Sequence, residues 1–154
     1  MTIKEALSDE LDNIVESIKK NLQASGKNTT GKTAESPRKE IKDSGTHIIG
    51  QIIVPRYFGV LETGRRPTPD KKPGREMLEN IREWADAKGL DDGIEWAIAT
   101  KINKEGTKLW KDGGRKDIFT PVTDDNAMSG VTERIGKVAA KSFAESITKV
   151  AALK

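Results

Sequence analysis

The residues that most directly suggest chemistry are a run of glycine, lysine and threonine at residues 26–33. Gly26-Lys27-Asn28-Thr29-Thr30-Gly31-Lys32-Thr33 matches the phosphate-binding expression G-x-x-x-x-G-K-T at every position. The motif binds phosphate when a buried strand delivers the loop and a helix follows it, because backbone N–H groups and the helix dipole then converge on the anion. Here an amphipathic helix precedes the run, and Ala34-Glu35-Ser36-Pro37 follows it. We therefore interpret the match as the product of a Gly/Lys/Thr-rich linker, and a nucleotide-dependent enzyme using Lys32 is only the third hypothesis.

Catalytic side chains of other kinds are few. The chain has no cysteine and one histidine, His47, which excludes thiolate nucleophiles, disulfides and multi-histidine metal sites. The two Asp-Asp pairs are explained more simply as helix N-caps than as catalytic carboxylates. A two-metal nuclease is a minor alternative, and we expect no catalysis, no cofactor and no metal site. The carboxylates that acid–base chemistry would have to use are Glu62, Asp70, Asp91, Asp92, Asp124 and Asp125.

A basic loop indicates a function more clearly than these candidate catalytic groups do. Between residues 65 and 75 five basic side chains face one acidic residue, which gives the segment a charge of +4. Its prolines keep it extended and exposed, so it can contact phosphates or an acidic protein surface; a solvated surface loop is an equal alternative. No aromatic residue lies among the charges, which favours duplex backbone or protein over single strands. The candidate contact residues are Arg65, Arg66, Lys71, Lys72 and Arg75.

Composition indicates a folded chain with a small core. Leu, Ile, Val and Phe make up about a fifth of the 154 residues, close to the lower limit for a folded domain. Because 27 basic residues are matched by 24 acidic ones, the net charge is only +3. A small core is typical of a protein that buries apolar surface against partners. The longest apolar run, 48–54, is too short for a membrane helix and the N-terminus lacks a signal pattern, so we expect a soluble protein made in the cytoplasm, without membrane contact.

The elements that must position these residues begin with an amphipathic helix. Apolar residues recur every three or four positions over 3–22, which predicts a helix there. Residues 23–37 offer almost nothing to bury and are predicted to be a flexible linker or arm. The pattern that follows is that of a sheet. It gives an edge strand over 38–43, a turn at 43–45, an isoleucine-rich strand over 46–54, and a third strand or a short helix over 57–62.

The next part of the chain is predicted to hold two helices and a hairpin. One helix covers 75–88 and stops at Gly89, and the other runs from a cap at Asp91-Asp92 to Gly106. Residues 107–120 have the pattern of a β-hairpin with Asp112-Gly113-Gly114 at its tip.

A long helix is predicted to end the chain. It starts at Asp124-Asp125 and would be about 40 Å long if it continued to Leu153, which is more than a core of this size can cover. Part of its apolar stripe is therefore expected to meet another subunit. The sequence predicts one α+β domain over 1–154, a small antiparallel sheet packed with amphipathic helices, whose body covers 38–154. The predicted interface residues of the long helix are Ile135, Val138, Phe143, Ile147 and Val150.

The order of these motifs resembles that of a known family. The segments that carry the resemblance are Ser25-Gly26-Lys27 with Gly31-Lys32, Val60-Leu61-Glu62-Thr63-Gly64-Arg65-Arg66-Pro67, Ile81-Arg82-Glu83-Trp84 with Lys88-Gly89, Ala97-Ile98-Ala99-Thr100-Lys101-Ile102 with Gly106-Thr107, and Gly113-Gly114 to Ile118-Phe119. Over about residues 24–150 the chain resembles the tail-completion, or head–tail joining, neck proteins of tailed bacteriophages. The Gly-Arg-x-Pro string is the most specific part of this resemblance. In this chain Arg66 follows the arginine of the string, so two arginines stand side by side, and the loop that follows is rich in lysine.

The resemblance implies a structural virion protein of the phage neck or tail, a head–tail connector or tail-completion component that acts by ring assembly. It implies an α+β fold without enzymatic activity. The expected partners are copies of the chain itself, portal or tail proteins, and DNA passing through the ring, in the neck or tail region of the virion. The alternative function is a DNA-binding accessory protein that uses the basic loop at 65–75.

Overall fold

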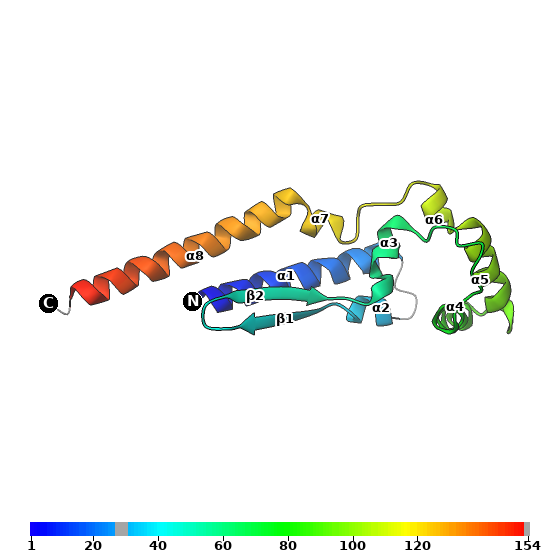
Figure 1. Ribbon diagram of the computed structural model, residues 1–154, viewed down its shortest axis with the longest axis horizontal. Coiled ribbons are helices and arrows are strands. Elements are labelled where there is room, and N and C mark those ends of the chain that lie inside the picture. The colour runs from blue at the N-terminus through cyan, green and yellow to red at the C-terminus, as the bar shows by residue number, and fades with distance from the viewer. Residues whose placement is uncertain (27–30, 153–154) are drawn as a thin grey trace.

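The chain folds into helices and one two-stranded antiparallel sheet, in a computed structural model that describes residues 1–26 and 31–152. The predicted α+β class, with a small antiparallel sheet and a long C-terminal helix, is confirmed. The elements are α1 (Ile3–Ala24), α2 (Lys32–Glu35), β1 (Arg38–Asp43), β2 (Ile48–Ile53), the 3-10 helix η1 (Arg56–Gly59), α3 (Val60–Thr63), α4 (Arg75–Ala87), α5 (Ile94–Glu105), α6 (Lys108–Lys111), α7 (Thr120–Thr123) and α8 (Asp125–Ala151). The molecule is elongated: α1 and the hairpin form its middle, α4–α6 form one end, and the tip of α8 forms the other (Figure 1).

Helix α1 is the central element and forms where the sequence predicts it. The Thr2 hydroxyl accepts a hydrogen bond from the Glu5 backbone N–H (3.1 Å), and the Glu5 carboxylate accepts one from the Thr2 N–H (2.7 Å). This capping box satisfies two N–H groups that a helix start leaves unpaired. The face that α1 buries follows the predicted spacing and consists of Ala6, Leu11, Ile14, Val15, Ile18 and Leu22.

Strands β1 and β2 lie along α1 as an antiparallel hairpin, at the two positions where strands are predicted. Gly50 lies so close to α1 that an added Cβ would come within 2.7 Å of Leu11 Cδ1. Lys4 pairs with Asp43 across the same contact (3.3 Å). Because a two-stranded sheet is only marginally stable by itself, the hairpin depends on this packing against α1.

Residues 57–62 are helical, which resolves the alternative left open by their pattern. Phe58 of η1 is 4% exposed, and its ring centroid lies 6.0 Å from that of Phe119. Both rings belong to or contact a single cluster in the middle of the molecule. In the described residues, α4, α5 and α6 contribute nothing to this cluster, which consists of Ile14, Ile18, Leu22, Ala34, Phe58, Ile118 and Val131.

The segment predicted as a flexible linker or arm, 23–37, is structured in its described part. Helix α1 extends to Ala24, α2 forms a single turn, and Ala34 is 4% exposed within the core. The expectation that this segment buries almost nothing is therefore wrong at Ala34. A small side chain is enough to anchor a polar turn on α1, and hydrophobic periodicity does not detect it. Residues 27–30 of the predicted arm lie outside the described residues.

Helices α4 and α5 pack against each other at one end of the molecule, and α4 and the C-terminal end of α5 follow the predicted bounds. The Arg82 guanidinium on α4 joins them by an ion pair to Glu95 on α5 (2.8 Å). The cap predicted for α5 is wrong, because its N-cap is Gly93 and not Asp91-Asp92. The helix starts only where its apolar period begins, at Ile94, so the two aspartates lie in the turn before it.

The β-hairpin predicted over 107–120 is wrong, because the segment forms the one-turn helix α6 and an irregular stretch that leads into the one-turn helix α7, which begins at Thr120. Thr107 is the N-cap of α6, and its hydroxyl accepts a hydrogen bond from the Trp110 N–H (3.3 Å). The Gly114 N–H donates to the Leu109 carbonyl (2.9 Å) and closes the turn. Glycines at positive φ occur both at hairpin tips and at helix ends, so the Asp-Gly-Gly run is compatible with either structure.

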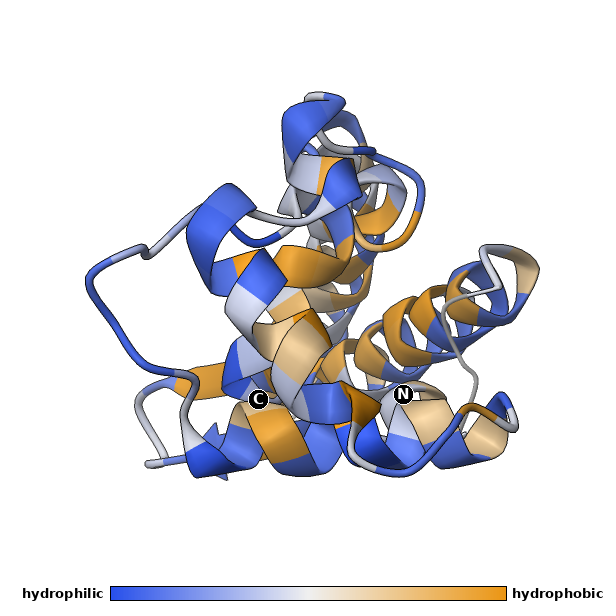
Figure 2. Ribbon diagram, turned by 90° about the vertical axis from the view of Figure 1, so that its right-hand side faces the viewer, coloured by the Kyte–Doolittle hydropathy of each residue, from blue (hydrophilic) through white to orange (hydrophobic). Residues whose placement is uncertain are grey.

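Helix α8 begins where predicted, with Asp124 as its N-cap accepting a hydrogen bond from the Ala127 N–H (2.8 Å). Its first half lies against α1, where Val131 is buried and Arg134 pairs with Glu10 (2.6 Å). Its second half runs past the N-terminal end of α1 and stands away from the body (Figure 1). The helices carry apolar segments between polar ones, as one-sided burial requires (Figure 2). Leu153, the predicted end of this helix, lies outside the described residues.

Candidate interaction surfaces

A buried carboxylate, Glu62, connects distant parts of the chain. Glu62 is 3% exposed, and its Oε1 accepts hydrogen bonds from the backbone N–H groups of Ile118 (2.7 Å), Phe119 (2.8 Å) and Thr120 (3.1 Å). Its Oε2 accepts a bond from the Thr120 hydroxyl (2.5 Å). These donors surround the start of α7, whose own N-cap residue provides no capping side chain. Glu62 therefore caps α7 from across the fold.

Hydrogen bonding decides the charge of Glu62. Burial alone raises the pKa of this carboxyl, but the bonds from the Thr120 hydroxyl and from three backbone N–H groups outweigh burial, and the pKa is lowered from its ordinary value of 4.5. Each of these bonds favours the charged form. Glu62 is consequently ionised at neutral pH, which suits a structural cap and does not suit a group that exchanges protons near pH 7.

The Gly-Arg part of the same segment is locked against residues 106–110. The Arg65 N–H donates to the Thr107 hydroxyl (2.9 Å), and the Thr107 N–H donates to the Arg65 carbonyl (2.9 Å). Gly64 has φ +71°, and a Cβ there would lie 2.3 Å from the Trp110 backbone nitrogen. Gly106 is also confined, since its Cβ would lie 3.0 Å from the Arg65 carbonyl oxygen. We call the set Glu62, Gly64, Arg65, Gly106, Thr107 and residues 118–120 the junction.

The basic loop leaves the junction and is held in place by α5. The Thr68 N–H donates to the Asn103 carbonyl (2.7 Å), and Asn103 Nδ2 donates to the Lys71 carbonyl (2.8 Å). Asn103 is 4% exposed, so both bonds lie on the inner side of the loop. The loop backbone is thus fixed by bonds to α5 as well as by its prolines, and its outer side chains face solvent.

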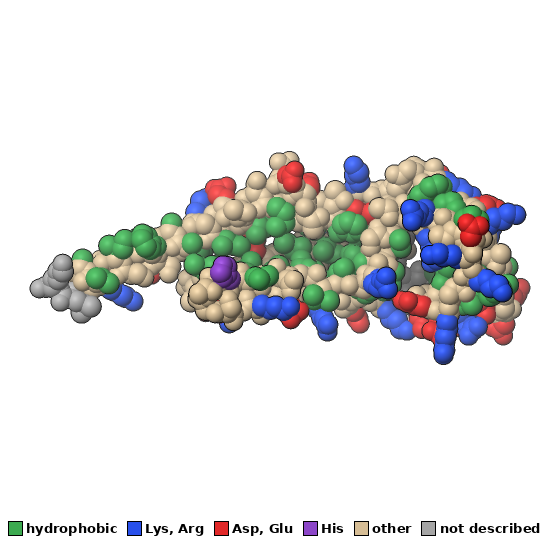
Figure 3. All heavy atoms as spheres, in the orientation of Figure 1, with side chains coloured by type: hydrophobic (Ala, Val, Ile, Leu, Met, Phe, Trp, Pro, Cys, Tyr) green, Lys and Arg blue, Asp and Glu red, His purple; other side chains and the backbone are tan. Residues whose placement is uncertain are grey.

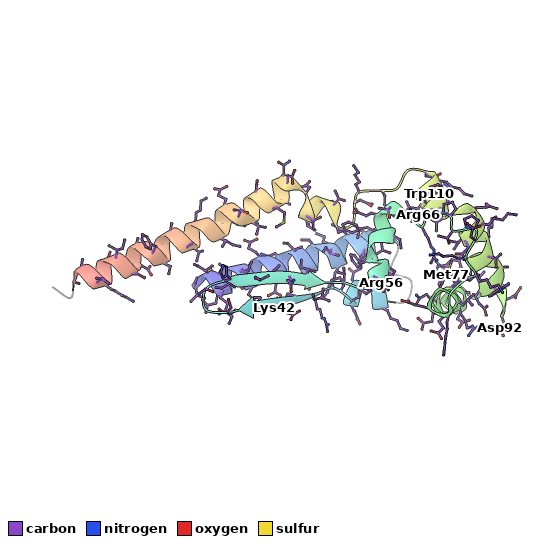
Figure 4. All side chains as sticks on the ribbon, in the orientation of Figure 1. Lys42, Arg56, Arg66, Met77, Asp92 and Trp110 are labelled. Carbon is purple, nitrogen blue, oxygen red and sulfur yellow. The ribbon has the colours of Figure 1, made fainter. Side chains whose placement is uncertain are left out.

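The five predicted contact residues occupy different environments. Arg65 is half-buried, and Arg75 begins α4 and pairs with Glu79 (2.7 Å). Arg66, Lys71 and Lys72 are exposed, and no carboxylate of the described residues forms an ion pair with them. Arg66 and Trp110 line the same hollow at this end of the molecule (Figure 4). Figure 3 shows basic side chains mixed with acidic ones over α4–α6, so the loop is part of a mixed surface and not of a uniformly basic one.

A cavity of about 330 Å³, lined by both apolar and polar side chains, lies between α4 and the segment around α3. Lys32 and Glu83 both border it, and they form an ion pair (2.8 Å). Trp84 and Val60 border it as well, and each is 40% exposed, so the cavity opens to solvent through apolar walls. Met77, which is labelled in Figure 4, lies on the α4 side. We call this cavity the α3–α4 cleft, and its principal apolar residues are Tyr57, Val60, Met77, Ile81 and Trp84.

The apolar stripe predicted on α8 is divided into two faces. Ile135 packs against the core and Val138 is partly buried, whereas Phe143, Ile147 and Val150 are 69%, 55% and 65% exposed. At about 100° per residue, the five-residue step from Val138 to Phe143 turns the stripe by about 140°. The second face therefore does not continue the first, and nothing in the described part of the chain covers it. We call Phe143, Ile147 and Val150 the distal α8 face.

The phosphate-loop match lacks the setting that the motif needs. Helix α1 precedes it, the helix after it is the single turn α2, and Lys32 is engaged by Glu83. Residues 27–30 of the match lie outside the described residues. Among residues 1–26 and 31–152, no three histidine or acidic side chains are grouped so that they could hold a metal ion. Within the same residues, no helix has the length and apolar character needed to cross a bilayer.

Neither Glu62 as a cap nor the α3–α4 cleft is visible in the sequence pattern. The bonding partners of Glu62 lie 56 to 58 residues away in the chain. The one available signal for the cleft is the apolar stripe of α4, from which Trp84 is left 40% exposed.

The fold and these surfaces define an elongated α+β protein with a central core, an anchored basic loop and, among the residues the structure describes, exposed apolar side chains that include those of the distal α8 face and the α3–α4 cleft. No family model matches the chain, and comparison with curated proteins and with solved structures finds no match either.

Proposed function

We propose that this chain is a structural component of the neck or tail of a tailed bacteriophage, a head–tail connector or tail-completion protein that acts by assembling into a ring. The observation that carries the proposal is the distal α8 face. Three large apolar side chains project from a helix that has left the body, each more than half exposed. An exposed apolar surface of this kind is typical of a subunit that is completed by its neighbours.

The segments that carry the resemblance to neck proteins also support this proposal. Residues 106–107 and 118–119 are far in sequence from residues 60–67, but each of these two segments bonds to residues 60–67 at the junction. Gly64 and Gly106 both sit where a side chain would collide with backbone. The motif is therefore a structural device that joins the core to α4–α5, which accords with an assembly protein better than with an enzyme.

The proposal is tested by the size and shape of the purified protein. Native mass spectrometry and negative-stain electron microscopy should detect rings of the wild type, alone or after addition of a portal or tail-tube protein. Phe143→Asp combined with Ile147→Asp should abolish these rings while leaving the far-ultraviolet circular dichroism unchanged. Glu145→Ala, on the opposite side of α8, is the matched control. A wild-type monomer that no portal or tail protein recruits would contradict the proposal.

A second candidate function is DNA contact through the basic loop, either within such a ring or as an accessory protein. Arg66, Lys71 and Lys72 support it, because they are exposed, lack ion-pair partners in the described residues and project from an anchored loop. Lys71→Ala with Lys72→Ala should weaken duplex binding and reduce the slope of log K against log salt by about 2. Lys101→Ala with Lys104→Ala removes the same charge from α5 and should change binding less. Equal effects of the two pairs would exclude a specific role for the loop.

A further inference from the structure

The fold brings an exposed tryptophan to the basic loop, although no aromatic residue lies within the loop itself. Trp110 of α6 is 43% exposed, and it lines the same hollow as Arg65 and Arg66 (Figure 4). Absence of an aromatic side chain was the reason to expect duplex backbone or protein, and not single strands, as the partner of the loop. That reason does not hold for the folded chain, because α6 supplies the aromatic side chain from a distant part of the sequence.

We propose that this end of the molecule binds single-stranded nucleic acid, with a base stacked on the Trp110 indole and the neighbouring phosphates on Arg66 and Lys116. The inference goes beyond ring assembly. It rests on the nucleic-acid contact of the second candidate function and names the form of nucleic acid that this contact selects. We call Trp110 and the two hollows that it borders the strand site.

Trp110 is held in place and is still accessible. Its backbone N–H donates to the Thr107 hydroxyl (3.3 Å), and a Cβ added at Gly106 would lie 3.1 Å from Cε3 of the indole. The indole therefore packs closely over Gly106, and the rest of the ring faces solvent. A ring that is already fixed loses little conformational entropy when a base stacks on it. Every base has a π-face, so such a contact accepts any sequence.

Each hollow that Trp110 borders contains an exposed cation. The first has a volume of about 430 Å³ and is lined by Arg66, and the second has a volume of about 450 Å³ and is lined by Lys116. In the described part of the chain, neither of these two side chains forms an ion pair. Both volumes fall in the range of about 300–1,000 Å³ that is typical of ligand sites. A strand that passes Trp110 from one hollow to the other therefore meets a cation in each.

The other charges that line the two hollows do not cancel these cations. Arg65 adds a positive charge to the first hollow, and Arg115 in the second is paired with Asp117. The acidic residue that lines the second hollow is Glu62, whose buried carboxylate already accepts the bonds that cap α7. Among the described residues, none from the acidic helix α4 lines either hollow. The strand site is therefore locally positive within a mixed surface, which suits a phosphate backbone.

Duplex and free nucleotides fit the strand site less well. The bases of a duplex are stacked on one another and would have to be extruded to reach Trp110, so a duplex would contact the cations alone. A free nucleotide would meet the cation of one hollow and leave the other hollow empty. A single strand can use the aromatic ring and both cations together.

The inference is tested by fluorescence anisotropy with a labelled oligothymidylate of about 15 nucleotides and a duplex of the same length. The wild type should bind the single strand more tightly than the duplex. Trp110→Ala should weaken single-strand binding about tenfold, with duplex affinity and the slope of log K against log salt unchanged, whereas Trp110→Phe should lose less than about threefold. Arg66→Ala and Lys116→Ala should each reduce the slope by about 0.7. Trp96→Ala is the matched control, because Trp96 is 53% exposed on α5 and lines neither hollow.

A second measurement leaves the strand site intact, in case Trp110→Ala fails to fold. The chain has three tryptophans, so Trp84→Phe combined with Trp96→Phe leaves Trp110 as the single emitting tryptophan. We expect the oligothymidylate to quench this emission over the same concentrations at which the anisotropy rises. Unchanged emission from the saturated protein would overturn the inference, since no base would then lie on the ring.

The outcomes separate this inference from the functions proposed above. Equal affinity for single strand and duplex, or wild-type affinity of a folded Trp110→Ala variant, would overturn the inference and leave the phosphate contact of the basic loop in place. Binding of neither form would overturn it together with the second candidate function, while ring assembly is measured separately. Displacement of the oligothymidylate by an equal concentration of thymidine monophosphate would also overturn it, because the site would then recognise a single nucleotide.

Discussion

At the scale of single residues, Glu62 is the group on which most of the junction depends. Removal of its side chain leaves three backbone N–H groups near the start of α7 without an acceptor, and an unsatisfied buried donor costs about 1–3 kcal/mol. Glu62→Ala should therefore lower the free energy of unfolding by about 3–5 kcal/mol, measured by urea denaturation. Glu62→Gln keeps the acceptor oxygen and should lose about 1 kcal/mol. A change below about 1 kcal/mol for Glu62→Ala would contradict the capping role.

The same carboxylate predicts how stability responds to acid. Its pKa is lowered in the folded chain, so its contribution is complete above the unfolded value of 4.5 and is lost as the pH falls through the lower folded pKa. The difference in unfolding free energy between wild type and Glu62→Gln should shrink below about pH 4.5 and stay constant from pH 6 to 8. Denaturation curves at several pH values check this. A difference in unfolding free energy that grows in acid would contradict this, because it would mean that folding raises the pKa of Glu62.

Gly64 gives a second prediction at this scale. Its backbone lies at φ +71° and ψ 175°, a region nearly restricted to glycine, and a Cβ would approach the Trp110 nitrogen to 2.3 Å. Gly64→Ala should therefore cost about 3 kcal/mol or more in unfolding free energy. Gly59→Ala is the matched control, because Gly59 has helical dihedrals and nothing within 4 Å of its added Cβ. Equal destabilisation by both substitutions would contradict the close approach.

The sequence could identify the importance of Gly64 and Arg65 but not what they touch. A Gly-Arg-x-Pro string specifies a turn, and its contact with Gly106 and Thr107 forms only when α4 and α5 return the chain to the same place. For the same reason, the sequence did not separate Glu62 from the other five candidate carboxylates. Its role depends on donors that are close in space and distant in sequence.

At the scale of elements, helix starts are best understood where a side chain caps them. Asp124 accepts the Ala127 N–H at the start of α8, and Asp125 is already inside the helix. Asp124→Ala should lower the unfolding free energy by about 1 kcal/mol. Asp125→Ala loses only the favourable interaction with the helix dipole and should cost about 0.5 kcal/mol. Thermal denaturation of the two variants side by side measures the difference, and the reverse order would assign the cap to Asp125.

Elements with long periodic patterns were predictable, and short ones were not. α1, α4 and α8 each carry an apolar stripe over several turns, and the β1–β2 hairpin follows a change of period. The segment after Thr107 has no such run: Leu109 and Trp110 are adjacent and lie between two lysines, which fits a strand or a single helical turn. Its structure is decided by the Thr107 hydroxyl and the Arg65 backbone, which lie outside any local pattern.

At the scale of the whole molecule, the core and the distal α8 face are separated. The core cluster lies in the middle, around α1, and the α3–α4 cleft borders it through Leu61, whereas the distal α8 face lies away from it (Figure 1). A small core was predictable from composition. The five-residue step that turns the α8 stripe away from α1 is also present in the sequence. Whether the residues after this step are buried or exposed depends on how far the body extends along α8, and only the fold defines that.

This separation predicts that folding and assembly can be uncoupled. A chain shortened to end at Ala140 keeps Val131, Arg134 and Ile135, which hold α8 against α1, and loses the whole distal α8 face. Because the deleted residues that the structure describes are exposed, apart from the partly buried Ser142, the unfolding free energy should change by less than about 1 kcal/mol, and the midpoint of thermal unfolding by less than about 3 °C. Rings should be absent by native mass spectrometry. A shortened chain that unfolds at much lower temperature would place the α8 tip within the folding unit, and one that still forms rings would move the subunit contact to another surface.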